Sequence, residues 1–197
     1  MVNSPYVVRT FRFVFLLILL TSCVAGKKLV PGEKKVIDTS EAQPKWVTKS
    51  IFAQEGCIYI VNSWMKGTTL ETAQEYAKKV AIAKLQDEVA LRFKTLYKQA
   101  LVELNLPEDK AFLIQGQQLI REAILPNVRE EDLYYEEYEE ETQTGIEDFY
   151  NVYFLISIPE NDFERAKLEA ISNIETEDET HQKILTWMKN MPLPSDY

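Results

Sequence analysis

The fold depends on two neighbouring stretches: residues 56–64, Gly56-Cys57-Ile58-Tyr59-Ile60-Val61-Asn62-Ser63-Trp64, and the long run from Thr69 to Leu104. The first stretch is rich in β-branched and aromatic residues, which predicts a strand. Because both faces of this strand are mostly apolar, we expect it to lie inside a sheet rather than at an edge.

The second stretch predicts one long helix from Thr69 to Leu104. Thr68 or Thr69 suits the N-cap, and Pro107 ends the helix. Apolar residues recur every three or four positions: Leu70, Ala73, Ala77, Ala81, Leu85, Val89, Phe93, Leu96, Ala100 and Leu104. The alanines of the first half allow close approach to a sheet. Such a helix is about 54 Å long, so it must bend or project, and a projecting half needs a partner such as the helix expected at 108–123.

The rest of the chain predicts a hairpin and two further helices. An acidic, tyrosine-bearing run at 130–141, a turn at 142–145 and a strand at 149–158 form the hairpin, and helical spacing follows at 162–174 and, weakly, at 180–191. The predicted class is α+β. We expect a small antiparallel or mixed sheet of about three strands, packed against the alanine-lined helix, with further C-terminal helices.

The N-terminus has the features of a secretory signal. Arg9 and Arg12 precede the apolar run 13–20, which is too short to span a bilayer, and Leu20-Thr21-Ser22-Cys23 follows it. These four residues resemble the lipobox of bacterial lipoproteins. The resemblance implies cleavage between Ser22 and Cys23 and acylation of Cys23, palmitate included. The alternatives are an ordinary signal peptide with an incidental cysteine, or a buried apolar helix.

This leader predicts both location and domain organisation. We expect a signal peptide at 1–22, a tether at 23–43, an α+β lipoprotein domain at 44–175, and a C-terminal helix and tail at 176–197. Acyl chains would anchor the protein in the cell envelope. In a cell with two membranes, Val24 favours the outer membrane, facing the periplasm or the surface. Lysines in the tether either contact anionic head groups or remain solvated.

Charge and composition exclude several classes of function. Lysine and arginine number 22 against 31 acidic residues, a net charge of −9, which becomes −11 when cleavage removes Arg9 and Arg12. That balance opposes nucleic-acid binding. One histidine and two cysteines do not form a typical zinc site, and no phosphate loop or hydrolase motif is present. We therefore predict no enzyme activity, no cofactor, no metal and no catalytic residue.

Two single residues have alternative interpretations. Once Cys23 is acylated, Cys57 is the remaining thiol, and it either cross-links two chains or packs in its strand as a small apolar residue. His181 has no recognisable serine or cysteine partner, which favours a surface residue over a catalytic one.

The acidic run at 130–141 also has two interpretations. It either binds Ca²⁺ or a basic partner, or it is a solvated strand edge whose charge opposes aggregation. Calcium loops need ligands at fixed spacing and a glycine turn, which favours the second interpretation. Residues 66–98 are basic, so helix and hairpin attract each other within one molecule or between copies.

The sequence also resembles the bacterial twenty-kilodalton, LPP-twenty-like lipoprotein family over roughly residues 44–170. The resemblance rests on Cys23, Pro44-Lys45-Trp46-Val47, Ile58-Tyr59-Ile60-Val61, the alanine-rich helix, and the strand at 150–156. A similar module is found at the N-terminus of a flagellar assembly protein. Asn62 stands where family members usually have glycine. The family implies an envelope-anchored, non-catalytic module with no cofactor.

Three functions remain to be separated. The first is a membrane-anchored envelope lipoprotein that acts through protein–protein contacts as a structural or accessory component, with envelope proteins as partners and self-association as a further option. The alternative is a binding module for a small apolar or envelope-derived ligand, which would need a closed cavity under the Ala73–Ala81 face. A hydrolase would need carboxylates about 5–10 Å apart across a cleft.

Overall fold

The computed structural model describes residue 30 and residues 32–194. In chain order the elements are β1 (Lys34–Thr39), η1 (Lys45–Thr48), β2 (Ile51–Gln54), β3 (Cys57–Gly67), α2 (Leu70–Leu104), α3 (Lys110–Ile124), η2 (Leu125–Asn127), β4 (Arg129–Glu141), β5 (Ile146–Pro159), α4 (Glu160–Ser172) and α5 (Glu179–Asn190). The predicted α+β class is confirmed.

The described residues form one sheet with the strand order β1-β4-β5-β3-β2, and every neighbouring pair is antiparallel. The prediction of about three strands was wrong, because β1 and β2 add one strand at each edge. β1 falls within residues expected to be a tether. It pairs with β4 through Lys34 opposite Glu140 and Val36 opposite Tyr138, so folded structure begins before residue 44.

The strand predicted at residues 56–64 is β3, and it lies inside the sheet, as expected. β3 lies between β2 and β5, with Ile58 opposite Ile158 and Ile60 opposite Ile156. It continues past Trp64 to Gly67 through a bulge. Its final glycine is required by packing, since a Cβ there would lie 2.5 Å from Ala73 Cβ at the start of α2.

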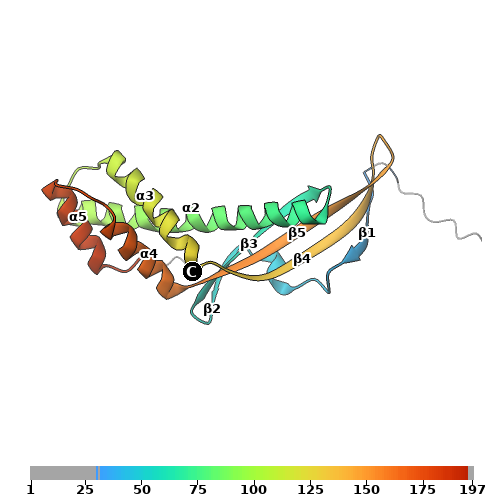
Figure 1. Ribbon diagram of the computed structural model, residues 1–197, viewed down its shortest axis with the longest axis horizontal. Helices are drawn as coiled ribbons and strands as arrows, with labels where there is room; N and C mark the ends of the chain where they lie inside the picture. The colour runs from blue at the N-terminus through green and yellow to red at the C-terminus, as the bar shows by residue number, and fades with distance from the viewer. Residues whose placement is uncertain (1–29, 31, 195–197) are drawn as a thin grey trace, which may run out of the picture.

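The bounds of the long helix are also confirmed. Thr69 is the N-cap and its hydroxyl accepts from the Thr72 N–H at 3.3 Å. Asn105, with φ 51°, is the left-handed C-cap that ends α2 before Pro107. Figure 1 shows that α2 projects: its first half crosses the sheet, and its second half lies among α3, α4 and α5.

The two halves of α2 are buried by different partners. Ala73, Ala77 and Ala81 are fully buried on the sheet side. Phe93 and Tyr97 in the second half are also fully buried, but by the helices that follow. We call this second region, the projecting half of α2 with α3, α4 and α5, the helical end. The sequence placed α5 outside the domain expected at 44–175. In the structure α5 contacts α2 and belongs to the same core.

Candidate functional site

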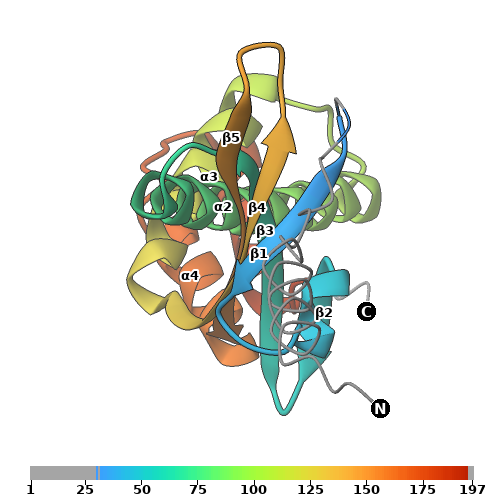
Figure 2. The same cartoon turned by 90° about the vertical axis from the view of Figure 1, so that its right-hand side faces the viewer.

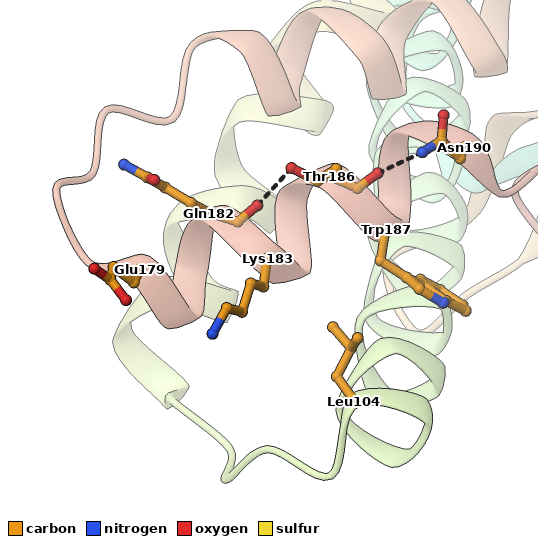
Figure 3. Close-up of a pocket in the computed structure, with 7 residues that line it drawn as sticks. All are labelled: Leu104, Glu179, Gln182, Lys183, Thr186, Trp187 and Asn190. Atoms are coloured by element: carbon orange, nitrogen blue, oxygen red, sulfur yellow. Dashed lines mark hydrogen bonds between the residues drawn. The ribbon is translucent and has the colours of Figure 1, made fainter.

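A hollow of about 660 Å³ lies at the helical end between α5 and the end of α2 (Figure 3), and it is the largest of the three hollows described below. We call it the distal groove. Its lining consists of Leu104, Glu179, Gln182, Lys183, Thr186, Trp187 and Asn190. In Figure 3, Lys183 and Trp187 project from α5 on the side of Leu104. An apolar floor with amide and charged walls is suited to holding a protein segment.

Local sequence explains why α5 presents this face. Asp178 caps the helix, because its carboxylate accepts from the Thr180 and His181 N–H groups at 2.7 and 3.1 Å. These bonds hold the pKa of Asp178 below its ordinary value of 3.8. Ile184, Leu185 and Met188 are buried. The opposite face of α5, which is polar apart from Trp187, is therefore the one that lines the distal groove.

A second hollow of about 440 Å³, the acidic groove, lies between the first half of α2 and β4. It is lined by Glu71, Gln74, Glu75, Lys78, Glu130, Glu131, Asp132, Leu133 and Phe154. Lys78 forms an ion pair with Glu130 across it. Helix and hairpin thus attract each other within one molecule, which is one of the two options that the charge pattern left open.

Several acidic side chains of β4 already have protein partners. Asp132 accepts from the Trp46 indole N–H at 2.9 Å, and Glu131 accepts from the Ser157 hydroxyl. Glu140 forms an ion pair with Lys66 at 2.8 Å. Among the residues the structure describes, no group of three or more His, Cys, Asp or Glu side chains is placed to hold a metal ion.

The third hollow, about 230 Å³, adjoins a buried ionic cluster that sequence reasoning missed. Arg92 is 5% exposed, donates to Glu88 at 2.9 Å and lies 4.9 Å from the Phe163 ring centroid. Lys167 is 2% exposed, and its ammonium lies 2.7 Å from Glu164. Buried charges of this kind need such partners. In the sequence, Arg92 is adjacent to Phe93 and Lys167 is adjacent to Ala166, and both neighbours belong to apolar helix faces. That placement is the sequence feature that indicates burial of the two cations.

His181 is more enclosed than the predicted surface residue, with a side chain 18% exposed. Its ring stacks on Phe112 with centroids 4.0 Å apart, and Nε2 lies 3.2 Å from Asp109 Oδ2. Nδ1 lies 3.3 Å from the Thr176 hydroxyl, which also accepts from the Asp178 N–H. None of the three hollows is lined by His181. The cluster joins α5 to the start of α3.

Asp109 connects this cluster to the helix cap of α3. Its carboxylate accepts from the Ala111 and Phe112 N–H groups at 2.9 and 3.2 Å. The Phe112 N–H is the main cause that lowers the pKa of Asp109 below its ordinary value of 3.8, and His181 adds to the effect. The Tyr97 hydroxyl bridges the Asp109 N–H and carbonyl, at 2.9 and 3.1 Å.

The other described residues singled out in the sequence, Cys57, Trp64 and the three helix alanines, line none of the three hollows. Ser22 and Cys23 are outside the described residues. Cys57 is a free thiol of intermediate exposure at the start of β3, opposite Pro159. Trp64 stacks on Tyr76, with centroids 4.7 Å apart. Ala73, Ala77 and Ala81 line none of the three hollows.

The chain matches no family model, no curated protein and no solved structure. The resemblance to the twenty-kilodalton lipoproteins therefore stays a prediction. Within residues 30 and 32–194, none of the helices combines the length and hydrophobicity needed to cross a membrane.

Proposed function

We propose that this chain is a lipid-anchored protein of the cell envelope. It acts through protein–protein contacts as a structural or accessory component, with no catalytic step. Cys23 is the acylated residue, and the outer membrane is the compartment that the leader and Val24 favour. The observation that carries the proposal is that the chain enters the fold at one end of an elongated molecule, and the distal groove lies at the other.

The anchored end is the hairpin end of the sheet. Lys34, the first residue of β1, pairs with Glu140, beside the turn between β4 and β5. Lys34 follows Cys23 by 11 residues, which span at most about 40 Å when extended. Acyl chains on Cys23 would therefore keep this end near the membrane.

The distal groove is far from that end. The 35 residues of α2 measure about 52 Å along the helix axis, and the groove is lined by its last residue, Leu104. Figure 1 shows the hairpin and the helical end at opposite ends of the long axis. A protein held at the hairpin end would thus present the distal groove to other envelope components, and we assign the partner contact to it.

The contact is tested by filling the groove. Thr186→Arg places a long cation in it without disturbing the core, because the Thr186 hydroxyl bonds only to the carbonyl of Gln182 in its own helix among the described contacts. Ser172→Arg is the matched control, since Ser172 makes the same kind of bond to Leu168 and lines none of the three hollows. The protein is purified from mildly solubilised membranes, and the proteins that co-purify are measured by quantitative mass spectrometry. We expect specific partners to be lost with Thr186→Arg. Equal partner sets for both variants would refute the groove as the contact.

The anchor is tested separately. Cys23→Ser should abolish labelling with radioactive palmitate and leave the protein soluble or unprocessed. A processed variant that still partitions completely into the detergent phase would overturn the anchor while leaving the fold untouched. Intact-mass measurement of the native protein gives an independent reading of the same modification.

A further inference from the structure

Within the described residues, the sheet offers four stretches of strand edge to a further strand. β1 and β2 are its outer strands, and β3 continues beyond β2, which pairs only with residues 57–60. β4 likewise continues beyond β1, which pairs only with residues 136–140. Edges of this kind attract other strands unless something blocks them. The four stretches differ in how they are blocked.

Side chains block the beginning of the free stretch of β3. Lys84 Nζ donates to the Val61 carbonyl at 3.1 Å, and the Ser63 N–H donates to Asn62 Oδ1 at 2.8 Å. The Asn62 amide is itself held by a bond of 3.4 Å to the Val80 carbonyl. Backbone groups that a further strand would need are already used. β2 is protected differently, since it has only four residues. The free stretch of β4 has a bulge between Glu130 and Asp132, and its Leu133 N–H donates to Asp132 Oδ1 at 2.8 Å.

β1 lacks comparable protection. Residues 34–38 are exposed, with Val36 at 55% and Ile37 at 41%, and β1 lies on the outside of β4 in Figure 2. The nearby side-chain bonds involve Ser40 Oγ and the Asp38 carboxylate, and within the part of the chain described here none reaches the backbone of residues 34–38. A bulge between Val36 and Asp38 and the charges of Lys34 and Lys35 are the features of β1 that oppose pairing.

The sequence of β1 is complementary to itself. Lys35 lies opposite Glu139 and Asp38 opposite Glu137, so both side chains are on the same face of the sheet. If a second β1 ran antiparallel about an axis between Val36 and Ile37, Lys35 of each copy would face Asp38 of the other. Opposite charges at directly opposed positions favour strand pairing.

We propose that β1 pairs antiparallel with β1 of a second copy and joins the two sheets into one. The contact uses the same surface on both chains, so it closes as a two-fold dimer and does not propagate into a filament. It uses neither the distal groove nor Cys23, and the failure of either assignment leaves it intact.

The test uses charge reversal on the full chain, with association measured by analytical ultracentrifugation in detergent. Lys35→Glu and Asp38→Lys should each weaken self-association about tenfold, because each puts like charges opposite one another twice. A mixture of the two variants should recover the affinity, since every introduced charge then meets its opposite. Lys110→Glu, an exposed change on α3, is the control.

The mixture separates pairing from a local folding defect. Lys35→Glu also places a carboxylate opposite Glu139, which could detach β1 from β4. A detached β1 would not recover on mixing, so no recovery overturns the proposal. A wild-type chain that stays monomeric at the highest concentration, growth beyond dimers, or an equal effect of Lys110→Glu would also overturn it.

Discussion

The two halves of α2 solve the same packing problem with opposite choices of side chain. Over the sheet, Ala73, Ala77 and Ala81 are fully buried because β3 comes close, as the contact between Gly67 and Ala73 shows. Beyond the sheet, Phe93, Leu96 and Tyr97 are fully buried because three later helices surround them. Small side chains thus allow α2 to pack closely on the sheet. Large side chains fill the wider space between α2 and the three helices that follow it in the sequence.

The largest effect is expected from emptying the projecting half. Phe93→Ala should lower the free energy of unfolding by about 3–5 kcal/mol, because it leaves a cavity where the ring meets α3 at Gly116. Leu91→Ala, at a site 55% exposed, should change it by less than about 0.5 kcal/mol. Urea unfolding measures both. Similar values for the two variants would show that the helical end does not depend on this ring.

A smaller effect is expected from filling the sheet-side half. Ala77→Leu adds atoms where the helix lies close to the sheet, and should cost about 1–3 kcal/mol. Ala83→Leu, on the exposed side of the same helix, should be nearly neutral. If Ala77→Leu stabilises the protein, the space beneath the alanines is larger than the structure indicates.

The smallest effect is expected on the acid dependence of stability, from a single carboxylate at the helical end. The pKa of Asp109 is lowered in the folded state, so its ionised form stabilises the fold above its ordinary pKa of 3.8, and this contribution is lost as the pH falls below that value. Asp109→Asn keeps a capping side chain but removes the charge. We expect a shallower loss of stability in acid, measured as the urea midpoint against pH. An unchanged slope would assign the acid response to other carboxylates.

Local signals predicted the central elements well. Thr69 and Pro107 bracket a stripe of period near 3.6, and each half of the stripe showed what it packs against. The hairpin was visible because an apolar strand follows the turn at 142–145. β1 was missed because its sequence, Lys34-Lys35-Val36-Ile37-Asp38-Thr39, is charged and has no alternation of apolar and polar residues. An exposed edge strand does not require such alternation. β2 has only four residues.

The candidate site was much less predictable. The distal groove combines Leu104 with α5, more than 70 residues later, and nothing local to either stretch indicates that they meet. The stacking and ionic partners of His181, Phe112 and Asp109, lie at the start of α3, far from His181 in the sequence. Asp178, three residues before His181, was the available signal that a capped helix begins there.

The order of strands has a consequence for how the protein folds. Lys34 pairs with Glu140, which is synthesised 106 positions later, so β1, the first strand among the described residues, must wait for the hairpin before it can join the sheet. Closing so long a loop is entropically costly, and contacts far apart in sequence form late. In pulsed hydrogen exchange during refolding, amides of residues 34–39 should gain protection after those of β3 and α2. The newly made chain therefore passes through a stage in which the outer side of β4 is bare.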